Sequence, residues 1–174
     1  MTRAFASLNP QEALHIAIFI EDRNADIYQR FAEMFTEFRD TESLEIASVF
    51  WDMSAEEKRH GAWLRNTYTE HFGSAVCPLT EEHLRELIEV PKLESGDVFE
   101  STEATQRTAR ERALQVALTA EQTAHEFYTR LAAQTAEGPM RRLYSELSVM
   151  EDGHVEVLLN LMREAPAEGP VTIQ

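Results

Sequence analysis

Apolar side chains recur every three or four positions over four long stretches of the chain, which is the pattern of amphipathic α-helices. The first stretch covers residues 9 to about 39 and opens with Asn9-Pro10. Asparagine is a good cap, and proline suits the first turn. The second stretch covers about residues 41 to 71, and Gly73 follows it as a helix-terminating residue. The short link between the two stretches predicts antiparallel neighbouring helices.

Residues 73 to 101 interrupt this pattern with prolines, and residues 80 to 90 predict a short extra helix there. Two further long helices are predicted at about residues 101 to 136 and 140 to 164. The long connection can return along the whole bundle. We therefore predict an all-α, ferritin-like four-helix bundle with a crossover between its second and third helices. Residues 1–164 would form this domain, and residues 165–174 a flexible tail.

Charged and imidazole side chains fall on the apolar seams of these helices, where water should be excluded. Glu57 and His60 are three residues apart, as are Glu151 and His154, so each pair lies on one helix face. The complete set of predicted metal ligands is Glu21, Glu57, His60, Glu121, Glu151 and His154.

An internal repeat relates these residues to one another. Residues 13–32 align with residues 113–132 at an offset of 100, and residues 50–64 align with residues 144–158 at an offset of 94. The aligned pairs are Glu21 with Glu121, Tyr28 with Tyr128, Glu57 with Glu151, and His60 with His154. The chain is thus two helix pairs, each with a glutamate on its first helix and Glu-x-x-His on its second.

Four buried carboxylates without compensation would be costly and would raise one another's pKa values. Two divalent cations offset four carboxylates charge for charge. Mixed carboxylate and imidazole ligands suit iron or manganese and tolerate zinc. This ligand pattern on four helices is that of di-iron and di-manganese carboxylate bundles. We therefore predict two bound Fe ions, with Mn or Zn as alternatives.

The amino-acid composition limits the binding partners and the cellular compartment that we expect. The net charge of −15 argues against nucleic acid and anionic membrane surfaces as partners. The single cysteine, Cys77, excludes an internal disulfide and a Cys-x-x-Cys site within this sequence. Residues 1–14 lack the apolar stretch of a signal peptide, and no apolar run is long enough for a bilayer. We expect a cytoplasmic protein.

The sequence resembles the ferritin-like superfamily and, within it, the di-iron domain of the rubrerythrin family, over roughly residues 9 to 164. The resemblance implies that Glu57 and Glu151 bridge two metals. It implies one site completed by Glu21 and His60, and the other by Glu121 and His154. It also implies that the phenols of Tyr28 and Tyr128 each hydrogen-bond a ligand carboxylate across the first and third helices.

Two departures from the family pattern bear on activity. Rubrerythrins usually carry a rubredoxin-like segment with paired Cys-x-x-Cys, whereas this sequence has a single cysteine and no Cys-x-x-Cys. Peroxidase-type members have an extra glutamate one turn after the third-helix ligand, where this chain has Ala124. The neighbouring His125 either compensates for that glutamate or flanks the site. The remaining set of four Glu and two His looks more like a bacterioferritin or ferroxidase centre.

The resemblance implies an oxidoreductase that reacts with H2O2 or O2, by peroxide reduction or ferrous-iron oxidation, in oxidative stress or iron homeostasis. An external donor, such as a separate rubredoxin-like protein, would supply electrons, and the protein would be a homodimer. Two alternatives stay open. One is iron storage or delivery without turnover. The other is a structural site for zinc or manganese.

Overall fold

The structure, a computed structural model, describes residues 8–74, 79 and 106–164. Four long helices account for nearly all of these residues: α1 (Pro10–Phe38), α2 (Thr41–Phe72), α4 (Gln106–Gln134) and α5 (Pro139–Glu164). The prediction of an all-α four-helix bundle is confirmed for this part of the chain. The predicted extra helix at residues 80–90 and the predicted tail at residues 165–174 lie outside it.

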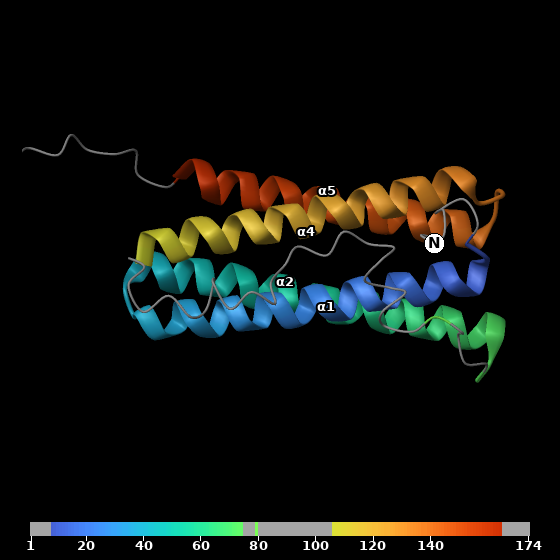
Figure 1. Cartoon of the computed structure of the whole chain (residues 1–174), viewed down its shortest axis with the longest axis horizontal. Helices are drawn as coiled ribbons and strands as arrows, with labels where there is room; N and C mark the ends of the chain where they lie inside the picture. The colour runs from blue at the N-terminus through green and yellow to red at the C-terminus, as the bar shows by residue number, and fades with distance from the viewer. Residues whose placement is uncertain (1–7, 75–78, 80–105, 165–174) are drawn as a thin grey trace, which may run out of the picture.

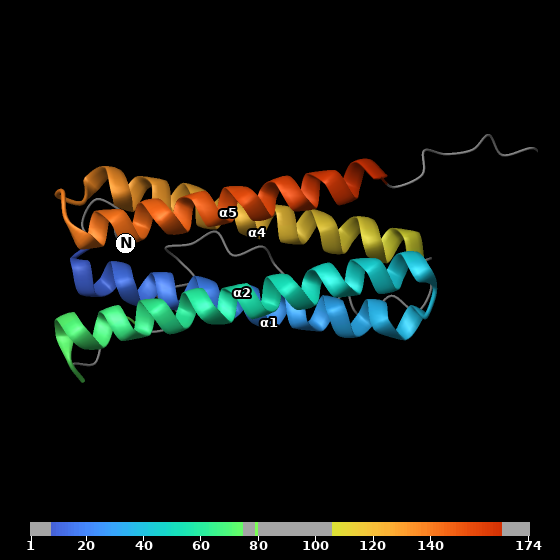
Figure 2. The same ribbon diagram turned by 180° about the vertical axis from the view of Figure 1, so that it is seen from behind.

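The helices are arranged as two antiparallel pairs, α1 with α2 and α4 with α5 (Figure 1). The pairs lie side by side, with α1 against α4 and α2 against α5. The end of α2 and the start of α4 lie at opposite ends of the bundle, so these two helices run parallel (Figure 2). This is the arrangement that the predicted crossover requires.

The ends of the first pair are fixed by local hydrogen bonds. Asn9 accepts from the backbone N–H of Glu12 at 2.9 Å, and Glu12 accepts in return from the backbone N–H of Asn9 at 3.0 Å. This reciprocal capping box starts α1. Asp40 caps α2 through the backbone N–H of Ser43 at 2.9 Å, after Arg39 turns the chain with a φ of 61°. The tight turn makes α1 and α2 neighbours.

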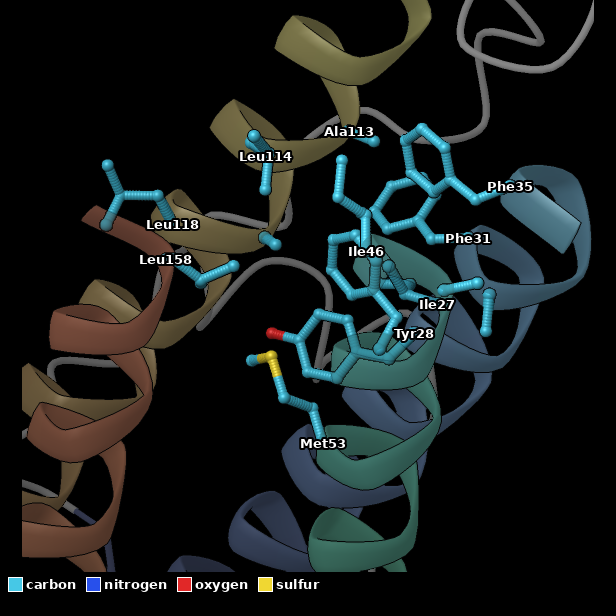
Figure 3. Close-up of a cluster of buried hydrophobic side chains, with 14 residues drawn as sticks. Ile27, Tyr28, Phe31, Phe35, Ile46, Met53, Ala113, Leu114, Leu118 and Leu158 are labelled. Carbon is cyan, nitrogen blue, oxygen red and sulfur yellow. The ribbon is translucent and has the colours of Figure 1, made fainter. Parts of the chain in front are cut away.

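The apolar core forms two clusters, and each draws residues from all four helices. The Tyr28 cluster, shown in Figure 3, lies toward the α1–α2 turn. The Tyr128 cluster lies toward the α4–α5 turn. The buried members of the Tyr28 cluster are Ile27, Tyr28, Phe31, Ala32, Phe35, Ile46, Ala47, Phe50, Met53, Ala113, Leu114, Ala117, Leu118 and Leu158. Those of the Tyr128 cluster are Ala13, Leu14, Ile16, Ala17, Ile20, Leu64, Ala124, Phe127, Tyr128, Leu131, Leu143, Tyr144 and Leu147.

Between the two clusters every helix contributes polar residues to one buried layer. On α1, for example, Glu21 follows Ile20 of one cluster and precedes Ile27 of the other. On the other three helices the polar residues also separate the two clusters, in the same chain order on α5 and in the reverse order on α2 and α4. None of the described helices combines the length and the apolarity that a membrane span requires.

Candidate metal centre

Three carboxylates surround Nδ1 of His60 on α2. This nitrogen lies 3.2 Å from Oε2 of Glu21, 3.3 Å from Oε2 of Glu57 and 3.5 Å from Oε1 of Glu151. One ligand atom from each of these four residues lies within 4.8 Å of the others, and all four residues are buried. Helices α1, α2 and α5 together therefore form one candidate position for a metal ion.

A second set of three carboxylates surrounds Nδ1 of His154 on α5. This nitrogen lies 3.0 Å from Oε1 of Glu57, 3.3 Å from Oε2 of Glu121 and 3.8 Å from Oε2 of Glu151. These four residues meet the same 4.8 Å limit and are buried. The imidazole rings of His60 and His154 stack with their centroids 6.0 Å apart. The two candidate positions are therefore adjacent.

Glu57 and Glu151 belong to both sets, and each turns one oxygen toward each histidine. Oε2 of Glu57 faces His60 and Oε1 faces His154. For Glu151 the assignment is reversed, with Oε1 toward His60 and Oε2 toward His154. A carboxylate in this orientation can give one oxygen to each of two ions.

The four oxygens of Glu57 and Glu151 have no hydrogen-bond donor among the described residues. The histidine nitrogens approach them, but none makes a hydrogen bond with them. Both residues are completely buried, and a buried polar atom without a partner is costly. Metal ions coordinated by these oxygens would remove that cost. The residues present therefore fit a pair of metal ions.

Two tyrosines fix the remaining carboxylates. Tyr28 on α1 donates a hydrogen bond to Oε1 of Glu121 on α4, and Tyr128 on α4 donates to Oε1 of Glu21 on α1. Both phenols are buried. Because each hydroxyl occupies Oε1, it leaves Oε2 facing the histidine. These are the contacts across the first and third long helices that the resemblance implied.

Burial raises the pKa of Glu21 and of Glu121 well above the usual carboxyl value, and the charges of Glu151 and Glu57 raise both further. Without metal, the layer therefore favours neutral acids at these two positions. A cation that binds there must displace protons.

Burial by itself lowers the pKa of the two histidines, but the surrounding carboxylates outweigh it. The neighbouring carboxylates of Glu151, Glu21 and Glu57 raise the pKa of His60 to about 12. The pKa of His154 is also raised, chiefly by Glu121 and Glu151. Without metal, the imidazoles are cations that partly balance the buried carboxylates.

His125 lies beside the centre rather than in it. Its Nδ1 is 2.9 Å from the backbone carbonyl of Ser148 on α5 and 3.3 Å from the Ser148 hydroxyl. The equivalent positions of the first helix pair also lie in contact, through different atoms. In the first helix pair, Ser54 donates to the carbonyl of Ala25 at 2.9 Å, and Ala25 corresponds to His125. Ala124 is buried in the Tyr128 cluster, so this position adds no oxygen to the layer.

Glu56 was not among the site residues predicted from the sequence. Its Oε2 lies 2.8 Å from Nε2 of His154, on the side of the ring away from the carboxylate layer. The Glu56 side chain is 44% exposed, so it lies off the apolar seam that marked the other residues. A possible signal is its position directly before Glu57, but nothing in the spacing links it to a helix of the other pair.

The arrangement of these ligands agrees with the protein family to which the sequence matches. The family model for Rubrerythrin matches residues 12–162, which includes all six predicted ligands and both tyrosines. Neither a curated protein nor a solved structure matches the chain. A match over most of the chain shows the family. The chain therefore belongs to the rubrerythrin family, a ferritin-like di-iron family.

Proposed function

We propose that the protein binds two iron ions in the polar layer and acts as an oxidoreductase that reduces H2O2 or O2. The observation that carries this proposal is the arrangement of Glu57 and Glu151. Their four oxygens are buried, lack hydrogen-bond donors among the described residues, and face one histidine each. Without metal, these oxygens would have no hydrogen bond from the described residues.

The ligand atoms alone do not distinguish iron from manganese. The layer offers carboxylate oxygens and imidazole nitrogens, which suit iron or manganese and accept zinc. Iron is proposed because the family is a di-iron family and because its two redox states serve the proposed reaction.

Two ferrous ions would supply the two electrons that convert H2O2 and two protons into two water molecules. The chain provides the surroundings for this reaction. Glu57 and Glu151 hold the two positions adjacent, while the phenols of Tyr28 and Tyr128 orient the terminal carboxylates. Burial of the layer limits access of bulk water. An external electron donor would then restore the ferrous state.

Because residue 124 is an alanine, the proposal includes both H2O2 and O2 as oxidants. The family's peroxidase-type pattern, as the resemblance implies it, has a glutamate where this chain has a buried methyl group. A ligand exchange through that position is therefore not available here. Peroxide reduction and ferrous-iron oxidation by O2 both remain within the proposed function.

The test begins with anaerobic loading of the metal-free protein with Fe(II), followed by metal analysis and stopped-flow mixing with H2O2 or O2 in separate experiments. We expect two irons per chain and oxidation by at least one oxidant. Glu151→Gln should bind less iron, whereas Glu126→Gln, which changes a carboxylate that is 74% exposed, should behave like the wild type.

The same samples separate the alternatives. Two bound irons that neither oxidant oxidises would contradict the oxidoreductase proposal. A native mass measurement checks the predicted homodimer. Two irons per chain in a dimer would count against storage, whereas many irons per chain would favour it. Strong stabilisation by zinc or manganese without redox activity would favour a structural site.

A further inference from the structure

The outer sides of the two histidines are not equivalent. Nδ1 of each ring faces the carboxylate layer, and Nε2 points away from it. Nε2 of His154 lies 2.8 Å from Oε2 of Glu56. Within the part of the chain that the structure describes, Nε2 of His60 has no hydrogen-bond partner. The repeat makes the two ligand sets equivalent in sequence. They differ in the hydrogen-bond partner of the outer histidine nitrogen.

The sequence accounts for the difference. The offset of 94 that relates His60 to His154 also relates Glu56 to Met150. Met150 is 41% exposed, and a thioether is only a weak hydrogen-bond acceptor. The carboxylate that serves one ring therefore has no equivalent for the other.

A carboxylate on the outer nitrogen changes how a histidine binds metal. It accepts a hydrogen bond from Nε2–H, so that the proton lost on metal binding is the one on Nδ1, whose lone pair then faces the layer. It also fixes the orientation of the ring and makes the ligand nitrogen more basic. Glu56 is itself held by Arg59, whose Nη2 donates to Oε1 at 3.1 Å. His154 is thus oriented before metal arrives, and His60 is less so.

We propose that Glu56 is a positioning residue that makes the two metal positions unequal. The position at His154 and Glu121 binds a divalent cation more tightly than the position at His60 and Glu21, and it fills first. This inference rests on the proposed di-metal function. It concerns the order and the affinity of binding, which the family assignment does not specify.

The experiment titrates the metal-free protein with Co(II), followed by absorption and calorimetry. The wild type should bind two ions in two phases, with dissociation constants about 10–100-fold apart, which is the usual effect of removing such an outer partner. Repulsion between the ions also separates the phases in a symmetric site. The decisive comparison is therefore between variants.

Glu56→Met makes the outer environment of His154 like that of His60. It should weaken the first phase by about 10–100-fold and bring the two phases together. Glu56→Asp should restore part of the lost affinity. Met150→Glu should have the opposite effect and strengthen the second phase. This gain would not follow if Glu56 only stabilised the helix. Asp52→Met, at an exposed carboxylate one turn before Glu56, is the control for charge and should match the wild type.

Two ions bound with unchanged phases in Glu56→Met would overturn the inference and leave the di-metal function standing. An equal loss of affinity in Asp52→Met would also overturn it, because the effect would then be one of net charge. Absence of Co(II) binding in the wild type would overturn the inference together with the proposed function. Failure of the inference and failure of the proposed function are therefore distinguishable.

Discussion

The hydroxyl of Tyr28 on α1 donates a hydrogen bond to Oε1 of Glu121 on α4, so one helix pair orients a carboxylate of the other. Tyr128 makes the reciprocal bond to Glu21. Both contacts cross the interface between the pairs at the level of the polar layer. The geometry of each candidate metal position therefore depends on the other helix pair.

Substituting Tyr28 with phenylalanine should damage both stability and metal binding. The change leaves Oε1 of Glu121 buried without a donor, which costs about 1–3 kcal/mol. Loss of such an outer contact should weaken metal binding by about 10–100-fold. Urea unfolding of the metal-free protein and Co(II) titration measure the two effects.

Tyr144→Phe is the matched control for Tyr28→Phe. The Tyr144 hydroxyl is buried and has no hydrogen-bond partner among the described residues, and its ring stacks on Tyr128 with centroids 6.5 Å apart. Removing this hydroxyl should leave stability unchanged or raise it slightly. Equal effects in the two variants would show that the Tyr28 hydrogen bond contributes nothing.

The metal-free protein should lose stability as the pH rises. The carboxyl pKa values of Glu21 and Glu121 are raised in the folded state, so the folded protein binds more protons than the unfolded chain above about pH 4.5, the ordinary value. The pKa of His60 is raised from 6.5 to about 12, so its contribution is complete below pH 6.5 and is lost progressively up to about pH 12. All three shifts have the same sign.

Thermal unfolding between pH 5 and pH 9 measures this dependence. The melting temperature of the metal-free protein should fall over this range, whereas the stabilisation by added metal should increase, because fewer protons must be displaced. A metal-free protein that becomes more stable toward pH 9 would contradict the assigned protonation of the layer.

Glu57→Gln should weaken both the metal-free fold and metal binding. Although burial raises the pKa of Glu57, its contacts with Glu21, His154 and His60 lower it overall, so removing this carboxylate should destabilise the metal-free protein by on the order of 1 kcal/mol. Wild-type protein should gain about 2.7 kcal/mol at a metal concentration 100 times Kd, and the variant should lose most of that gain. Glu126→Gln is the surface control. A metal-free variant more stable than the wild type would contradict the assigned charges of the layer.

His125→Ala should affect stability but not metal binding. The variant loses the hydrogen bond from the ring to the Ser148 carbonyl, at a cost of about 1 kcal/mol. Co(II) affinity should stay within a few fold of the wild type. A large loss of affinity would instead place His125 among the residues that serve the centre, as one interpretation of the sequence allowed.

The helices and the polar layer could be predicted because both leave periodic signals. A carboxylate such as Glu21 stands out on an apolar seam, and the repeat indicates its partner Glu121. Glu56 leaves no such signal. It is partly exposed, and its contact His154 is 98 positions away on the other helix pair. Sequence spacing relates residues on one helix, but contacts between pairs depend on how the pairs pack.

The position of the polar layer has a consequence for how the molecule unfolds. The layer separates the Tyr28 cluster from the Tyr128 cluster, and each cluster holds together one end of all four helices. Without metal, the two ends are connected only through the continuous helices and a layer of buried polar groups. We expect their melting to be partly independent, with a calorimetric enthalpy above the van't Hoff value. Bound metal would join the two ends into one cooperative unit.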